Sequence, residues 1–163
     1  MRVFSVVCLW LIWAGLLPAQ DRGKESVARL RTVLLFGTND NLSEVVPEAE
    51  TAEKGHTLRM QLLKDLNFES YGVIGTDIQP IWRSYTNWAS PMKGSDKILL
   101  SFEPTSEAEA DGVKLDLELW QGKEKVMKTT LPLRKDKWLY IAGPEWRSGR
   151  LIVGIELLPL EDE

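Results

Sequence analysis

Alternation of hydrophobic and polar residues is clearest in the second half of the chain. In residues 113–120, Val113, Leu115, Leu117 and Leu119 alternate with polar or charged positions, which predicts a strand with one face in the core and the other in water. Turn-forming segments separate this run from its neighbours, so we predict a meander of antiparallel hairpins, with residues 143–149 as a loop. The other predicted strands of the meander are residues 97–102, 125–133, 138–142 and 150–158.

The first half of the chain predicts a different order of elements. An apolar run at residues 27–36 predicts a strand that ends in a turn, and residues 68–78 predict a second strand with Gly72 and Gly75 as candidate bulges. Between them, residues 47–66 predict the one main helix, because Pro47 suits a first helical position and acidic residues follow it. A strand, a long helix and a strand predict a crossover unit with the helix on one face of the sheet.

Residues 79–96 join these two halves and contain the densest cluster of large aromatics, prolines and turn residues. The fold that follows is α+β and rich in strands. It consists of a strand-helix-strand unit followed by a mostly antiparallel meander, with closure into a sandwich as one outcome. A length of 163 residues is typical of one domain with its own core. We therefore predict a single globular domain over residues 27–160.

Residues 1–20 have the layout of a secretory signal peptide. Arg2 supplies positive charge, residues 3–17 are apolar, and Ala19 and Gln20 are the predicted cleavage positions. The apolar run is shorter than the roughly 20 residues that span a membrane, so contact with a membrane is expected only if the signal is not cleaved. This predicts a secreted or periplasmic protein.

Cleavage has two chemical consequences. It removes Cys8, the only cysteine, so the mature chain has no disulfide. It also removes Arg2 and no acidic residue, which lowers the net charge from −4 to −5. A chain this acidic has no bulk attraction to nucleic acid, and it has no glycine-rich phosphate loop for a nucleotide.

Few residues favour catalysis or a metal. His56 is the only histidine and has no partner ligand for a metal in the mature chain. Asp116 and Glu118 share one strand face and are the candidate carboxylate pair of a hydrolase, although solvated strands commonly show this alternation. The acidic residues of the loop at 103–111 lack the spacing of a calcium loop. Asn41 begins a glycosylation pattern that matters only in a secreted eukaryotic protein. We therefore predict no enzyme activity, no cofactor and no metal.

The large aromatics are the strongest candidates for a binding surface. Exposed tryptophan and arginine anchor many protein interfaces, and flat aromatic faces also stack on sugar rings. The alternative is that these rings close the core. The predicted aromatic/arginine patch consists of Trp82, Arg83, Tyr85, Trp88, Trp146 and Arg147.

Four segments carry a resemblance to a known group of proteins. They are residues 35–40 (Leu-Phe-Gly-Thr-Asn-Asp), 71–75 (Tyr-Gly-Val-Ile-Gly), 82–85 (Trp-Arg-Ser-Tyr) and 143–146 (Gly-Pro-Glu-Trp). Together they resemble a group of small exported proteins of planctomycete and verrucomicrobial bacteria. The resemblance implies an exported bacterial protein and assigns no activity.

The leading functional hypothesis is a non-enzymatic module of the bacterial cell envelope that recognises another envelope protein through the aromatic/arginine patch. The alternatives are a carbohydrate-binding module that uses the tryptophan faces and, third, a hydrolase that uses Asp116 and Glu118.

Overall fold

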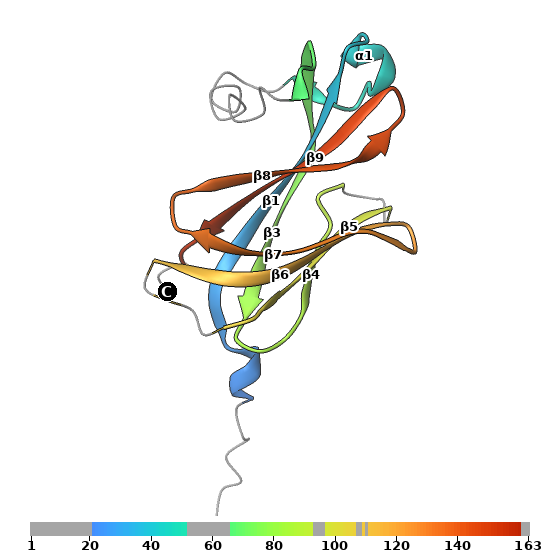
Figure 1. Ribbon diagram of the computed structural model, residues 1–163. Helices are drawn as coiled ribbons and strands as arrows, with labels where there is room; N and C mark the ends of the chain where they lie inside the picture. The colour runs from blue at the N-terminus through green and yellow to red at the C-terminus, as the bar shows by residue number, and fades with distance from the viewer. Residues whose placement is uncertain (1–20, 52–65, 93–96, 107–108, 110, 161–163) are drawn as a thin grey trace, which may run out of the picture.

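The computed structural model describes residues 21–51, 66–92, 97–106, 109 and 111–160. These residues form two antiparallel sheets with very little helix (Figure 1). The elements in chain order are η1 (Arg22–Lys24), β1 (Ser26–Thr38), α1 (Leu42–Val45), β2 (Glu50–Thr51), β3 (Ser70–Trp82), β4 (Asn87–Ala89), β5 (Ile98–Pro104), β6 (Gly112–Gln121), β7 (Glu124–Arg134), β8 (Trp138–Trp146) and β9 (Gly149–Leu158).

The strand order is β2-β3-β1-β9-β8 in one sheet and β4-β5-β6-β7 in the other. All strand pairs within these sheets are antiparallel, so the strand-rich, mostly antiparallel prediction is confirmed. The predicted meander is divided, because β5 to β7 belong to one sheet and β8 and β9 to the other. β8 also continues through most of the predicted loop at 143–149, and its hairpin turn contains Arg147 in the left-handed region at φ 50°.

The predicted crossover unit is wrong. β1 and β3 are direct antiparallel neighbours, whereas a crossover connects parallel strands. The predicted helix also does not begin at Pro47. A one-turn helix, α1, precedes it, and Glu50 already belongs to β2. Asn41 caps α1 by accepting a hydrogen bond from the Ser43 amide, and proline cannot continue such a helix. Most of the rest of the predicted helix lies outside the described residues.

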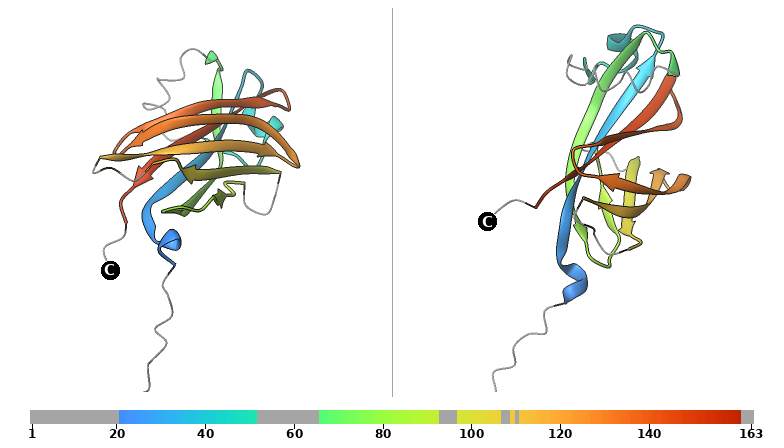
Figure 2. Two further views of the ribbon diagram at one scale, coloured as in Figure 1. Left: turned by 60° about the horizontal axis from the view of Figure 1, so that its bottom comes forward. Right: turned by 60° about the vertical axis from the view of Figure 1, so that its left-hand side comes forward.

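One hydrophobic core contains residues of both sheets. Leu34 and Phe36 of β1 are fully buried in the same cluster as Leu117 of β6 and Val153 of β9. Figure 2 shows the four-stranded sheet against one face of the long strands β1 and β3. A smaller cluster on the opposite face of β1 contains Val33, so this strand is buried on both faces near its end, as its apolar run predicted.

Residues 79–96 contain the passage from one sheet to the other. β3 ends in the five-stranded sheet at Trp82, and β4 opens the four-stranded sheet at Asn87. Two side chains hold this passage in place. The Asn87 amide donates to the Pro80 carbonyl at 2.8 Å, and the Asp77 carboxylate accepts from the Ser90 amide at 2.7 Å. The predicted junction is therefore the connection between the two sheets.

Candidate functional site

The structure does not bring the aromatic/arginine patch together. Trp82 pairs with Ser26 at the start of β1, whereas the hairpin that carries Trp146 and Arg147 pairs through Gly149 with Thr38 at the end of β1. β1 has 13 residues, and a strand rises about 3.3 Å per residue. The two halves of the predicted patch therefore lie about 40 Å apart, at opposite ends of the molecule.

Trp146 and Arg147 make contacts within the fold. The Trp146 ring packs edge-on against buried Phe36, with centroids 5.5 Å apart. The Arg147 guanidinium lies 4.2 Å from the centroid of the Trp146 ring. It also donates to the Val45 carbonyl and pairs with Glu48 at 3.6 Å, which ties the hairpin to the α1 region.

Arg83 and Tyr85 hold the segment before β1. The Arg83 guanidinium contacts the Glu25 carboxylate at 2.8 Å, and the Tyr85 hydroxyl donates to Asp21 at 2.9 Å. That hydrogen bond, with a smaller contribution from the negative charge of Asp21, raises the pKa of Tyr85 above its ordinary value of 10.0. Gly23 lies against the tyrosine ring, where an added Cβ would come 2.5 Å from a ring carbon. Two more patch residues thus have partners within the chain.

Trp88 differs from the rest of the patch. It belongs to β4 and pairs with Ser101 of β5. Leu100 and Phe102, on either side of Ser101, point into the core, so Ser101 and Trp88 lie on the other face of the sheet. The Trp88 side chain is 45% exposed and lies beside Trp120 of β6, with ring centroids 6.0 Å apart. Lys125 extends over Trp120 at 5.1 Å from the ring centroid. A tryptophan of the edge strand β4 and one of the inner strand β6 therefore form an aromatic pair on the outer side of the four-stranded sheet.

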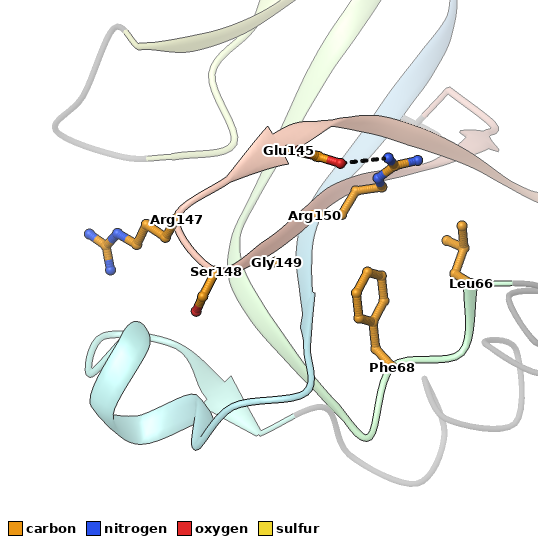
Figure 3. Close-up of a pocket in the computed structure, with 7 residues that line it drawn as sticks. All are labelled: Leu66, Phe68, Glu145, Arg147, Ser148, Gly149 and Arg150. Atoms are coloured by element: carbon orange, nitrogen blue, oxygen red, sulfur yellow. Dashed lines mark hydrogen bonds and ion pairs between the residues drawn. The ribbon is translucent and has the colours of Figure 1, made fainter.

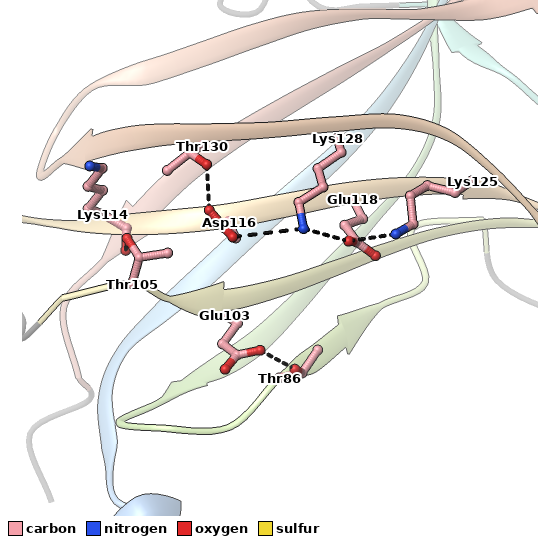
Figure 4. Close-up of polar contacts among 9 residues, drawn as sticks. All are labelled: Thr86, Glu103, Thr105, Lys114, Asp116, Glu118, Lys125, Lys128 and Thr130. Atoms are coloured by element: carbon pink, nitrogen blue, oxygen red, sulfur yellow. Dashed lines mark hydrogen bonds and ion pairs between the residues drawn. The ribbon is translucent and has the colours of Figure 1, made fainter.

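Polar side chains continue this outer side from the tryptophans across the sheet. Thr86 donates to Glu103 at 2.6 Å, and Thr130 donates to Asp116. Figure 4 shows these groups on one face of the sheet. We call this surface the polar face, and its members are Thr86, Trp88, Glu103, Thr105, Lys114, Asp116, Glu118, Trp120, Lys125, Lys128 and Thr130.

A shallow cavity of about 110 Å³ lies on the polar face, lined in part by Thr86, Glu103, Asp116 and Lys128. At roughly 30 Å³ per water molecule, it holds only a few waters. A group such as one sugar hydroxymethyl fits this volume, whereas a whole small-molecule substrate needs a pocket several times larger.

Glu118 shares its carboxylate between two lysines. The Lys125 and Lys128 ammonium groups lie 2.8 Å and 3.2 Å from the same oxygen. The hydrogen bond from Lys125, with further contributions from Lys128, lowers the pKa of Glu118 below its ordinary value of 4.5 despite an opposing desolvation effect. A general acid needs a raised pKa, so the lowered pKa of Glu118 does not suit that role in a hydrolase.

Replacing Glu118 with glutamine tests these ion pairs. Because the folded-state pKa of Glu118 is lowered, its carboxylate stabilises the fold above pH 4.5, and this contribution is lost as the pH falls through the lowered pKa. We expect Glu118→Gln to be less stable than the natural chain at pH 7, and the difference to shrink towards pH 3. Urea unfolding across this range measures it. Glu69 is exposed, and its side chain forms no hydrogen bond or ion pair with the described residues, so Glu69→Gln is the control. A Glu118→Gln difference that stays constant with pH contradicts the prediction.

A second pocket, of about 580 Å³, lies at the opposite end, between the β8–β9 hairpin and residues 66–68. Figure 3 shows Phe68 and Leu66 on one side and the Glu145–Arg150 pair, 3.5 Å apart, on the other. Arg147 also lines the opening, but its side chain points away from Phe68 and Leu66. The pocket is wide open, and its polar lining residues, Glu145, Arg147, Ser148 and Arg150, all come from the β8–β9 hairpin.

Part of the polar face was predicted from the sequence. The prediction covered the shared face of Asp116 and Glu118 and named Trp88 as a candidate binding residue. It missed Thr86 and Glu103, because β4 and β5 meet β6 only through sheet pairing. The proline and turn residues around Thr86 gave no signal of that neighbourhood.

The remaining predicted positions add no site. His56 and Glu107 lie outside the described residues, Asp111 pairs with Arg134 at 3.0 Å, and Asn41 serves as the α1 cap. Within the described ranges, no three His, Cys, Asp or Glu side chains are placed to hold a metal ion. In that same part of the chain, no helix has the length and apolar character needed to cross a bilayer.

Comparison with known proteins gave no match: no family model, no curated protein and no solved structure is significantly similar to this chain. The resemblance to exported planctomycete and verrucomicrobial proteins stays a prediction. The polar face is therefore the only basis for assigning a function.

Proposed function

We propose that the protein is an exported, non-enzymatic binding module that holds polysaccharide on the polar face of its four-stranded sheet. The observation that carries the proposal is the exposed Trp88 ring, which lies beside Trp120. Carboxylates and hydroxyls extend the same surface across the sheet. Sugars offer apolar ring faces and polar hydroxyl edges together, and this surface complements both.

The shape of the surface also favours a chain-like ligand. β4 to β7 lie side by side, and neighbouring strands are about 4.8 Å apart, so the polar face extends about 14 Å across the sheet. An open face of this width accepts a segment of a long polymer from either side. Closure of the two sheets into a sandwich is part of the proposal, and the core that they share supports it.

Recognition of an envelope protein through the aromatic/arginine patch has less support. Five of the six patch residues contact other parts of the chain, Trp88 among them through Trp120, and the patch is divided between two ends. Export, which depends on residues 1–20, is retained in the proposal as a prediction from the sequence.

Affinity electrophoresis in gels that contain polysaccharides tests the proposal. We expect Trp88→Ala to weaken retardation at least about tenfold, the effect of losing one central aromatic anchor. Tyr85→Ala is the matched control, because it removes a ring of nearly equal exposure, 44% against 45%, from outside the polar face. We expect it to bind normally.

The outcomes separate the two binding hypotheses. Equal retardation of Trp88→Ala and the natural chain contradicts binding on the polar face. A second outcome would favour protein recognition: no polysaccharide retards the protein, and an envelope protein co-purifies with it. If both Trp88→Ala and Tyr85→Ala then lose that partner, the aromatic/arginine patch is the binding surface instead.

A further inference from the structure

We infer that the cavity on the polar face is a subsite for one hydroxymethyl group, so that the protein selects polysaccharides whose hexose units carry this group free. The inference rests on the proposed function and names the ligand class of the same site. It follows from a buried serine without a partner, from the mixed chemistry of the cavity lining, and from the position of the cavity next to Trp88.

Ser101 is the residue that marks the cavity as a binding site. It lies on the outward face of β5 and helps to line the cavity, yet it is only 4% exposed. Its hydroxyl has no hydrogen-bond partner in the part of the chain that the structure describes. A buried hydroxyl without a hydrogen bond lowers the stability of a fold. This one is therefore suited to a ligand group that enters the cavity.

The rest of the lining offers both acceptors and donors of hydrogen bonds. The Glu103 and Asp116 carboxylates are direct cross-strand partners, and one oxygen of each accepts from a threonine hydroxyl (Figure 4). Lys128 also lines the cavity and supplies an ammonium donor, 4.0 Å from the second oxygen of Asp116. A hydroxyl group both donates and accepts, whereas a carboxylate only accepts and an ammonium only donates. A neutral hydroxyl therefore complements this mixture best.

Net charge does not decide the ligand class. The polar face has three carboxylates and three lysines, and Lys114 forms no ion pair with the described residues (Figure 4). Lys114 is not among the residues that line the cavity. The selectivity inferred here therefore comes from the size and lining of the cavity and not from overall attraction or repulsion of charge.

The cavity adjoins Trp88. Ser101 is the cross-strand partner of Trp88, and Thr86, which also lines the cavity, comes two residues before it. Direct partners in an antiparallel pair have Cα atoms about 4.5–5.5 Å apart. A sugar ring stacked on Trp88 therefore has the cavity within reach of its exocyclic hydroxymethyl group. A pentose has no such group, and a hexose that is linked through this group has none free.

Three pairs of polymers test the inference: mixed-linkage β-glucan and arabinoxylan, soluble starch and dextran, and laminarin and pustulan. The first member of each pair has free hydroxymethyl groups along its backbone. The second has a pentose backbone or is linked through the hydroxymethyl carbon. Affinity electrophoresis of the full chain gives an affinity for each polymer.

We expect the first member of any pair that binds to bind at least about tenfold more tightly, the effect of one hydrogen bond to an ionised group. Equal or tighter binding of the second member overturns the inference and leaves the proposed function standing. If neither member of any pair binds, the proposed function itself fails, and the inference fails with it.

Ser101→Ala tests whether the cavity is the source of this preference. Because its hydroxyl has no partner in the fold, we expect a nearly unchanged melting temperature and a preference that is narrowed about three- to tenfold. Glu103→Ala removes an exposed acceptor of the same cavity and should narrow the preference as well. Ser84→Ala, at an exposed position of the β3–β4 connection, is the matched control and should leave it unchanged. A preference that stays the same in both Ser101→Ala and Glu103→Ala overturns the assignment of the cavity.

Discussion

Trp146→Ala is expected to lower the free energy of unfolding by about 2–3 kcal/mol, because the ring packs on the core and leaves a cavity beside Phe36 when it is removed. Arg147 also loses the ring beneath its guanidinium. For a domain of this size, such a loss lowers the melting temperature by about 10 °C. Thermal and urea unfolding followed by circular dichroism measure both quantities.

Trp88→Ala is the matched control for this prediction, because it is the same substitution at an exposed ring. We expect it to change stability by less than about 1 kcal/mol while polysaccharide binding is lost. Trp146→Phe should recover most of the stability. Equal destabilisation by Trp88→Ala and Trp146→Ala would show that both rings belong to the core.

Gly75→Ala is expected to be the most damaging glycine substitution in β3, with a loss of about 3 kcal/mol or more. An added Cβ at this position lies 1.9 Å from the Pro91 carbonyl oxygen, which is backbone and cannot rotate away. The segment after β4 must move off β3, and overpacking of this kind costs about 1–3 kcal/mol before sheet contacts are lost. Urea unfolding measures the effect.

Gly122→Asn is the control for Gly75→Ala. Gly122 has a positive φ of 61° with no atom within 4 Å of an added Cβ, and asparagine tolerates this conformation. We expect a loss of less than about 1 kcal/mol. If Gly75→Ala is no worse than Gly122→Asn, β3 and Pro91 are not in tight contact.

The position of Gly75 shows how far the sequence could be interpreted. A bulge was predicted near it, and the β1–β3 register does shift at this point, where Ile74 is left without a partner. The local sequence nevertheless did not show why position 75 needs a glycine. The close approach of Pro91 joins residues 16 positions apart across two sheets, and no local pattern records such a contact.

The same limit explains the error in the first half of the chain. Pro47 and the acidic residues after it indicated a helix over residues 47–66, and a helix between two strands implies parallel strands. The observed β1–β3 pairing is antiparallel over 12 pairs of residues. Whether two strands pair in parallel or antiparallel depends on which strand edges meet in the sheet. The hydrophobic pattern of a single strand is the same in both cases.

Strand positions in the second half followed from the chain alone, because side chains alternate between the two faces of every strand regardless of its neighbours. That local rule placed Leu115, Leu117 and Leu119 in the core and Asp116 and Glu118 in water. Assembly of the polar face needed the pairing of β4, β5 and β6, which places Trp88 beside Trp120 and Glu103 opposite Asp116. Contacts between residues 13 to 32 positions apart form only when the sheets do.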